Sequence, residues 1–366
     1  MSDNDYLLGG LLKNVSRSFY LTLRVLPEGL RAPIGLAYLL ARAADTIADT
    51  AILPPQRRLE LLLEFRAQVN GAMNEARLRE LAALLGPHQS HRHERILLES
   101  LSPALRLLEP LGARERAEVR GVVTTLTTGM EFDLRTFPLE SAGQLAALRD
   151  MGELDRYIYL VAGCVGEFWT TLNVAHTPAL RGWNVAEMSA RGVRFGKALQ
   201  LTNVLRDCAK DLRSGRCYLP ADKLAALGLR PEDLLQPENA ARARPLLVEL
   251  LRAALDHYRA AAEYLLAIPP SCGRQRLACL WPVLIGLETL KLLAANGAWL
   301  HPARPSKVTR GYVYRSLTIS LPAVGSDTLV RAWIDRLVQA CEENCAPKTP
   351  PPAPPLNGGG ENGTRH

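Results

Sequence analysis

The sequence lacks several patterns that would place it in common protein classes. No long stretch alternates between apolar and polar residues, which argues against a β-sandwich or β-barrel. No Gly-x-Gly-x-x-Gly motif follows a strand, so a dinucleotide site of the Rossmann type is excluded. The net charge is +7, but no Lys/Arg block is interleaved with aromatic residues, and we expect no nucleic-acid partner.

Cysteine pairs, a signal sequence and an uninterrupted apolar run are also missing. The seven cysteines form no Cys-x-x-Cys pair, and a chain of 366 residues needs no disulfides to build a core. The most apolar window, 277–300, is broken by Pro282, Glu288, Lys291 and Asn296, which is typical of a buried helix. The N-terminus carries no basic region followed by an apolar run. We therefore expect a cytoplasmic protein with reduced thiols, whose positive charge favours transient contact with membrane surfaces.

Helical periodicity dominates what is present. Hydrophobic residues make up 48% of the chain and recur at helical spacing nearly throughout, which predicts a single all-α domain over residues 1–346. Residues 347–366 are rich in Pro and Gly with few large apolar side chains, and we expect a disordered tail there. The sequence leaves the oligomeric state open. Helices are predicted near residues 16–26, 33–50, 57–85, 94–108, 114–131, 152–173, 187–213, 245–268, 276–297 and 325–342.

Two acidic pairs with the same spacing are the most informative feature. Asp45 and Asp49 are four residues apart in a helix that is otherwise nearly all apolar. Together with Tyr38 and Arg42 they fall within an arc of about 60° on one helix face. A buried carboxylate without a partner is very costly, so this stripe must line a cavity or find buried partners. A salt-bridge cluster between Arg42 and the two aspartates under a loop is the alternative.

The second pair, Asp207 and Asp211, repeats the pattern. It shares an arc of about 80° with Gln200 and Asn203, and Arg206 lies beside it. Mg²⁺ prefers oxygen ligands, usually one or two carboxylates plus substrate phosphates. Arg, Asn and Gln supply the hydrogen-bond donors that a diphosphate needs. Four clustered carboxylates without a cation would repel one another, so the two pairs together indicate a site for Mg²⁺ and a diphosphate.

Four ordered motifs resemble those of squalene and phytoene synthases, the head-to-head prenyl synthases. Residues 16–19 resemble the family's N-terminal Ser-Arg-Ser-Phe element, and residues 38–49 its first aspartate-rich motif. Residues 155–166 resemble its central helix, and residues 200–220 its second aspartate-rich motif. The similarity extends over residues 14–317, and four motifs in one order make it specific.

This resemblance implies an all-α isoprenoid-synthase bundle around a central cavity. It implies that Mg²⁺ binds at Asp45, Asp49, Asp207 and Asp211, and that Tyr157 takes part in proton transfer and cation stabilisation. Tyr38, Arg42 and Arg206 join Tyr157 as catalytic candidates. The residues expected to hold the substrate diphosphates are Ser16, Arg17, Ser18, Tyr38, Arg42, Gln200, Asn203 and Arg206.

Two positions depart from the family pattern and bear on the product. Lys210 stands where many relatives carry an acidic residue, and Thr46 gives a DTxxD motif, closer to squalene synthases than to phytoene synthases. The segment 306–310 is similar to the basic flap that helps squalene synthases hold NADPH, which suggests Lys307 and Arg310 as nucleotide contacts. A solvated basic loop is the alternative for this segment.

Three functions therefore compete at this level. The first is a squalene synthase that condenses two farnesyl diphosphates through presqualene diphosphate and then reduces the product with NADPH. The second is a relative that makes phytoene, dehydrosqualene or hydroxysqualene without hydride. The third, a non-catalytic assembly or lipid-binding relative, fits poorly because a scaffold has no use for a Mg²⁺–diphosphate site.

Overall fold

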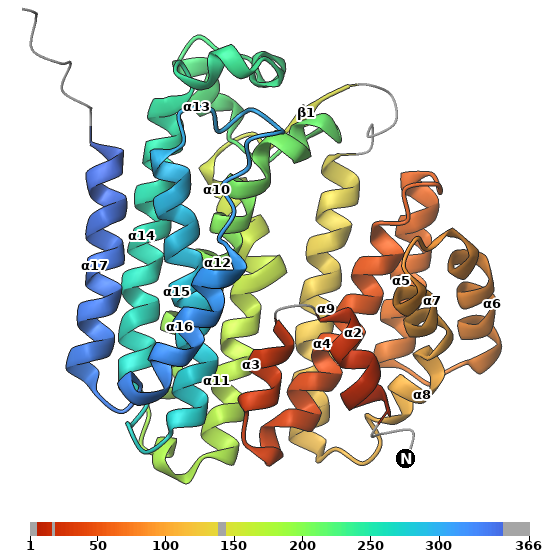
Figure 1. Cartoon of the computed structure of the whole chain (residues 1–366). Coiled ribbons are helices and arrows are strands. Elements are labelled where there is room, and N and C mark those ends of the chain that lie inside the picture. The colour runs from red at the N-terminus through yellow and green to blue at the C-terminus, as the bar shows by residue number, and fades with distance from the viewer. Residues whose placement is uncertain (1–5, 17–18, 138–143, 347–366) are drawn as a thin grey trace, which may run out of the picture.

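The protein is an all-α bundle, as predicted. The computed structural model describes residues 6–16, 19–137 and 144–346 (Figure 1). Within these ranges the only strands are β1 (Ala146–Ala147) and β2 (Arg216–Cys217), which pair in parallel. The predicted tail at 347–366 lies outside the described residues, and the single-domain reading stays a prediction.

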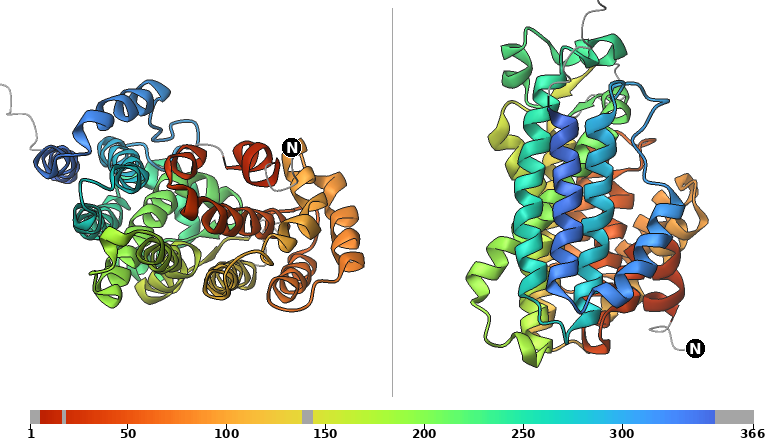
Figure 2. Two further views of the ribbon diagram at one scale, coloured as in Figure 1. Left: turned by 90° about the horizontal axis from the view of Figure 1, so that it is seen from below. Right: turned by 60° about the vertical axis from the view of Figure 1, so that its left-hand side comes forward.

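Long helices run side by side through the molecule. Figure 2 shows α14, α15 and α17 next to one another on one face, and α12 packs against α10, α11, α14 and α15 in the interior. The helix bounds are α2 (Leu12–Val15), α3 (Phe19–Val25), α4 (Glu28–Ala48), α5 (Pro55–Asn70), α6 (Glu75–Leu85), α7 (Arg92–Glu99), α8 (Leu101–Arg106), α9 (Ala113–Thr136), α10 (Met151–Ile158), α11 (Cys164–His176), α12 (Val185–Arg213), α13 (Ala221–Ala226), α14 (Arg244–Ala267), α15 (Gly273–Ala295), α16 (Arg310–Ala323) and α17 (Asp327–Cys345). The π-helical segments η1 (Tyr6–Leu11) and η3 (Tyr159–Gly163) and the 3₁₀ segments η2 (Gly86–His88), η4 (Pro178–Leu180), η5 (Pro231–Leu235) and η6 (Pro237–Ala240) complete the chain.

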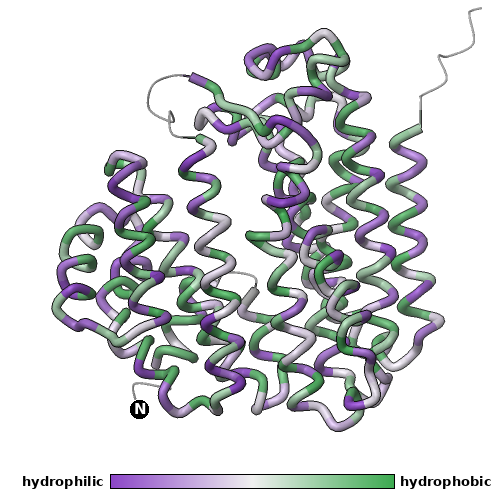
Figure 3. Tube along the Cα trace, turned by 180° about the vertical axis from the view of Figure 1, so that it is seen from behind, coloured by the Kyte–Doolittle hydropathy of each residue, from purple (hydrophilic) through white to green (hydrophobic). Residues whose placement is uncertain are grey.

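The hydrophobic core consists of two clusters that meet at α11. One cluster gathers residues of the N-terminal helices up to Leu134, and the other gathers residues from Phe137 to Cys345. Phe168 of α11 belongs to the first cluster, while the neighbouring Trp169 packs against both. Hydrophobic and hydrophilic residues alternate along most helices, as expected for amphipathic helices around a core (Figure 3). The space between the clusters is where the candidate site lies.

Two helical stretches are long and apolar enough to cross a membrane by length and composition alone. They are 151–176, which spans α10, η3 and α11, and α15. In α15, 72% of the most apolar window is buried inside the bundle, in agreement with the buried core helix inferred from the sequence. For 151–176 the value is 44%, because part of its surface borders cavities described below.

Some helix boundaries differ from those predicted. The stretch 57–85 contains two helices, because Asn74 accepts a hydrogen bond from the Arg77 backbone N–H and starts α6 anew. The stretch 94–108 likewise divides at Ser100. Helix α4 begins at Glu28, so that Pro33 lies inside it. The helix α16 was not predicted, since its Gly, Ser, Thr and β-branched residues are weak helix formers.

Helices α11 and α12 cross with their backbones in contact. A Cβ atom built on Gly166 would lie 1.9 Å from the carbonyl oxygen of Gly192, far inside van der Waals contact. Only glycine therefore fits at this crossing. The contact fixes α12, which carries the second acidic pair, relative to α11.

We expect Gly166→Ala to destabilise the fold by about 3 kcal/mol or more, because the added methyl group forces two packed backbones apart. Gly121→Ala is the matched control, since Gly121 is also helical but has no atom within 4 Å of the added methyl. The control should be neutral or slightly stabilising. Urea unfolding curves measure both effects, and an unchanged midpoint for Gly166→Ala would rule out this helix crossing.

Candidate active site

A polar cavity of about 220 Å³ lies between α4, α9, α10 and α12. Carboxylates from two distant parts of the chain face it, together with tyrosine, arginine and amide side chains. Its polar lining residues are Asp45, Asp49, Asp133, Tyr157, Gln200, Arg216 and Tyr218.

The first acidic pair reaches this cavity from the end of α4. Asp49 is exposed and follows the last residue of the helix, with its backbone N–H bonded to the Asp45 carbonyl at 2.8 Å. The Arg42 guanidinium donates to Asp45 and to Glu94 of α7. The salt-bridge alternative is thus partly realised, but the Asp45 side chain keeps 39% of its surface exposed.

The charges of this pair are not fully compensated. Burial and the charge of the neighbouring Asp49 together raise the pKa of Asp45 to about 6, against the opposing effect of Arg42. A carboxyl whose pKa lies this high gains free energy from a proton or a cation. The pair is therefore an attractive place for a divalent ion.

The second acidic pair lies near the C-terminal end of α12. Burial raises the pKa of Asp211 to about 7, and the charge of Asp207 acts in the same direction. Asp207 accepts two hydrogen bonds from its neighbour Arg206, one of them 2.9 Å from Nε to Oδ1. Lys210, the departure from the family pattern, is exposed and lowers the Asp211 pKa.

Three residues that the sequence reasoning did not assign connect the two pairs. Asp133 of α9 forms an ion pair with Arg216 (Nη1 to Oδ2, 3.0 Å). Its Oδ1 accepts a hydrogen bond from the Tyr218 hydroxyl at 2.6 Å. The charges of Asp133 and Arg216 both act on the Asp211 carboxyl. The β1–β2 pairing fixes Arg216, because the Ala146 N–H donates to the Gly215 carbonyl at 3.0 Å.

Tyr157 packs against this group. Its ring stacks on Tyr218 with centroids 4.8 Å apart. Burial, followed by the charge of Asp133, raises the pKa of the Tyr157 phenol well above its ordinary value. The phenol is therefore neutral at physiological pH and presents an electron-rich ring next to the cavity.

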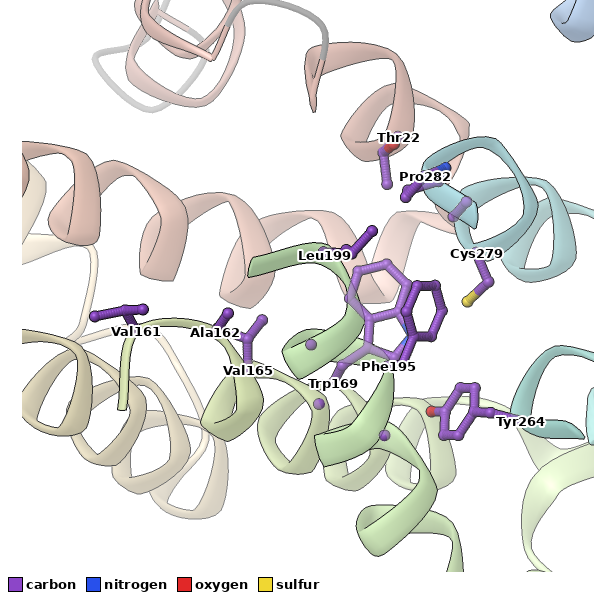
Figure 4. A pocket seen from close by; sticks show the side chains of 14 residues that line it. Thr22, Val161, Ala162, Val165, Trp169, Phe195, Leu199, Tyr264, Cys279 and Pro282 are labelled. Carbon is purple, nitrogen blue, oxygen red and sulfur yellow. The ribbon is translucent and has the colours of Figure 1, made fainter. Parts of the chain in front are cut away.

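An apolar hollow of about 180 Å³ adjoins the polar cavity and shares Val161 with it. Figure 4 shows Val161, Ala162 and Val165 along one side and the rings of Trp169, Phe195 and Tyr264 together at the other. The rings of Phe195 and Tyr264 meet edge to face, with centroids 6.2 Å apart. The lining of the hollow is almost wholly apolar, which suits a hydrocarbon chain.

A third hollow of about 240 Å³ lies beneath α16. It shares Thr22, Leu199 and Pro282 with the apolar hollow, so the three spaces adjoin one another around α12. Asn203 and Arg206 line it. The polar stripe of α12 is therefore divided, with Gln200 facing the acidic cavity and Asn203 and Arg206 facing the third hollow.

The remaining predicted residues that the structure describes line none of these three spaces. Ser16 is buried, and its hydroxyl donates to the Leu12 carbonyl. Arg17 and Ser18 lie outside the described residues. Lys307 and Arg310 are exposed, just before α16 and at its first position. Tyr38 is half-buried on α4 close enough to Arg42 for their charges to interact. The binding roles assigned to these residues stay predictions.

The residues at the site fit a divalent cation. Among the described residues, no group of three His, Cys, Asp or Glu side chains is placed to hold a metal by itself. Mg²⁺ usually takes one or two carboxylates and completes its shell with water and substrate phosphates. The pairs Asp45/Asp49 and Asp207/Asp211 offer such carboxylates.

Comparison with known proteins decides the family. A family model described as squalene/phytoene synthase matches residues 12–311. The chain belongs to this family. It is 27% identical over 302 residues to the squalene synthase of Eremothecium gossypii, which covers 78% of this chain and 61% of that protein. It is 29% identical over 260 residues to the bifunctional lycopene cyclase/phytoene synthase of Colletotrichum graminicola, over 70% of this chain and 41% of that protein.

The fold agrees with solved structures of the family. The structure of TcSQS with the ligand E5700 superposes with a TM-score of 0.73 at 22% identity, over 94% of this chain and 98% of that chain. The predicted isoprenoid-synthase bundle is thereby confirmed. The chain spans about three fifths, 61%, of the length of the squalene synthase of Eremothecium gossypii.

The raised pKa values predict how stability depends on pH in the absence of divalent ions. Because the folded pKa values of Asp45 and Asp211 are about 6 and about 7, the folded protein holds more protons than the unfolded chain from about pH 4 upward. Stability should therefore fall as pH rises from about 4 to about 7.

Asp211→Asn should flatten this decline, and Asp335→Asn, at an exposed position, should leave it unchanged. Thermal melts in a chelating buffer across this pH range measure the effect. A melting temperature difference between wild type and Asp211→Asn that does not change with pH would contradict the electrostatic description of the site.

Proposed function

We propose that the protein is a prenyltransferase of the squalene synthase type. It joins two farnesyl diphosphates head-to-head to presqualene diphosphate and reduces this intermediate to squalene with NADPH. The observation that carries the proposal is that a polar cavity lined by several carboxylates adjoins an apolar hollow, in a chain of this family.

The polar residues bind and orient the diphosphates. Mg²⁺ held by the aspartate pairs would neutralise the diphosphate and make it a better leaving group. Arg42 and Arg206 each present a planar guanidinium suited to phosphate oxygens, although both are now paired with aspartates. Gln200 adds an amide donor at the acidic cavity, and Asn203 adds one at the third hollow.

The apolar residues hold the hydrocarbon chains and keep water out. Loss of diphosphate from an allylic carbon leaves a carbocation, which must meet the double bond of the second prenyl group before it meets water. The hollow beside η3 and α11 is lined almost wholly by apolar side chains. The neutral ring of Tyr157 lies where it can stabilise positive charge through its π face.

The reductive half of the reaction rests on the basic segment before α16. Lys307 and Arg310 lie at the N-terminal end of α16, where the helix dipole also favours negative charge. These donors fit the phosphates of a nucleotide, and NADPH bound there would supply the hydride that ends the reaction. Relatives that make phytoene, dehydrosqualene or hydroxysqualene omit this hydride and are the alternative products.

A binding protein without activity remains the competing class. Retention of all four aspartates together with Arg42, Arg206 and the Asp133–Arg216 pair favours catalysis, since a scaffold gains nothing from clustered carboxylates with raised pKa values. We also propose that the protein is cytoplasmic and meets membranes peripherally, because its substrate tail and product are apolar.

Incubation with farnesyl diphosphate and Mg²⁺, with and without NADPH, tests the reaction. We expect squalene only when NADPH is present, and its loss on removal of Mg²⁺. Product formed equally well without nucleotide favours the non-reductive alternatives. No turnover with farnesyl or geranylgeranyl diphosphate would contradict the proposed activity.

Neutralising either acidic pair should abolish turnover without unfolding the protein. We expect Asp45→Asn and Asp207→Asn to lower the rate by about 100-fold or more, because each removes a charge that holds the cation. Circular dichroism should show unchanged helical content, and Asp335→Asn serves as the exposed control. Wild-type rates in both site variants would rule out the metal roles of these residues.

A further inference from the structure

The helix α16 buries small polar side chains and exposes large apolar ones. Its buried side chains are Ser316, Ser320 and Ala323. Its exposed side chains include Tyr314, Ile319 and Leu321, which keep 67%, 47% and 59% of their surface exposed. A helix in water normally buries its large apolar residues and exposes its serines. The helix also half-buries Val313 and Leu317, yet three large apolar side chains remain on its outer surface.

The exposed apolar residues of the molecule gather at this helix. Of the nine exposed large hydrophobic side chains among the described residues, four lie between positions 314 and 329. The fourth is Leu329, which is 55% exposed at the start of α17. We call Tyr314, Ile319, Leu321 and Leu329 the α16 face. Single exposed hydrophobics are ordinary, but such a concentration marks an interaction surface.

The charge around the α16 face selects its partner. Helix α16 carries two exposed arginines, Arg310 and Arg315, and no Asp or Glu. Asp327, at the start of α17, is paired with Arg276, and Arg315 lies over the ring of Tyr312. Exposed apolar side chains flanked by basic residues are what an anionic bilayer surface attracts. In a symmetric dimer through the same face, these basic residues would oppose one another.

The position of the α16 face adds a second argument. Val313 and Leu317 of the same helix line the third hollow, and the exposed Leu321 continues their stripe four residues further on. Leu21 of α3 borders this hollow as well and is 37% exposed. Figure 1 shows α16 and α3 on the same side of the bundle. A bilayer against α16 would therefore lie next to the mouth of the space that leads to the apolar hollow.

We propose that the α16 face, with Arg315 beside it, docks on anionic phospholipid bilayers and places the third hollow at the membrane surface. The apolar side chains enter the headgroup region and the arginines contact lipid phosphates. Passage of prenyl chains between the bilayer and the hollow rests on the proposed function. The docking itself does not.

Co-sedimentation of the full chain with vesicles tests the docking without any turnover. The vesicles are phosphatidylcholine alone, or phosphatidylcholine with phosphatidylserine. We expect tighter binding to the anionic vesicles and weakening by salt. The double variant Tyr314→Ser, Leu321→Ser should bind both kinds of vesicle about tenfold more weakly or worse, because it removes much of the buried apolar area.

Arg315→Glu should weaken binding to the anionic vesicles by about fivefold or more and leave binding to phosphatidylcholine unchanged. The matched controls are Ile52→Ser, where the wild-type side chain is 67% exposed like that of Tyr314, and Arg79→Glu, at an exposed position. Both controls should bind as wild type does. Thermal melts check that every variant folds. If the double serine variant does not fold, Arg315→Glu still tests the proposal.

Three results would overturn the proposal. The first is that the wild-type protein does not bind anionic vesicles at low salt. The second is that both α16 variants bind vesicles as tightly as the wild type does. The third is that the protein forms a dimer in solution and Leu321→Ser converts it to a monomer. The last would assign the face to a second copy. Wild-type protein that binds vesicles but turns over no prenyl diphosphate would refute the proposed function and leave the docking intact.

Discussion

Mutual repulsion of clustered carboxylates is the constraint on which the site depends. Asp45 and Asp49 line one cavity with Asp133, and the charge of Asp133 also acts on Asp211 of α12. Arg42, Arg206 and Arg216 compensate part of this charge, yet the pKa values of Asp45 and Asp211 remain raised. A fold selected for stability alone would replace such residues, so their presence indicates a cationic ligand.

The same arrangement joins charge to a hydrocarbon environment. Helix α12 is the shared wall, because it borders the acidic cavity, the apolar hollow and the hollow beneath α16. Its position is fixed by the backbone contact at Gly166 and Gly192. Diphosphate and prenyl chain can thus lie side by side without water between them. The α16 face places exposed apolar side chains on the outer surface of the helix that covers the third hollow.

Much of this could be predicted from the sequence, since the signals were local. Helical periodicity gave the fold class, and the spacing of Asp45, Asp49 and Asp207 gave the two acidic helices. Asp133 was missed because it has no motif, and only the packing of α9 brings it to Arg216 and Tyr218. Gln200 and Arg206 line different cavities because of how the neighbouring helices pack, and their positions on one helix do not reveal this packing. Helix α16 escaped prediction because its Gly, Ser, Thr and β-branched residues are weak helix formers, and only the packing shows which of its side chains are exposed.

Calorimetric titration with inorganic diphosphate tests the central idea most directly, because it needs neither prenyl chain nor nucleotide. The account predicts that diphosphate binds only in the presence of Mg²⁺, and that Asp45→Asn and Asp207→Asn each remove this binding while Asp335→Asn does not. Diphosphate binding of equal affinity with and without Mg²⁺, or undiminished in both site variants, would contradict it.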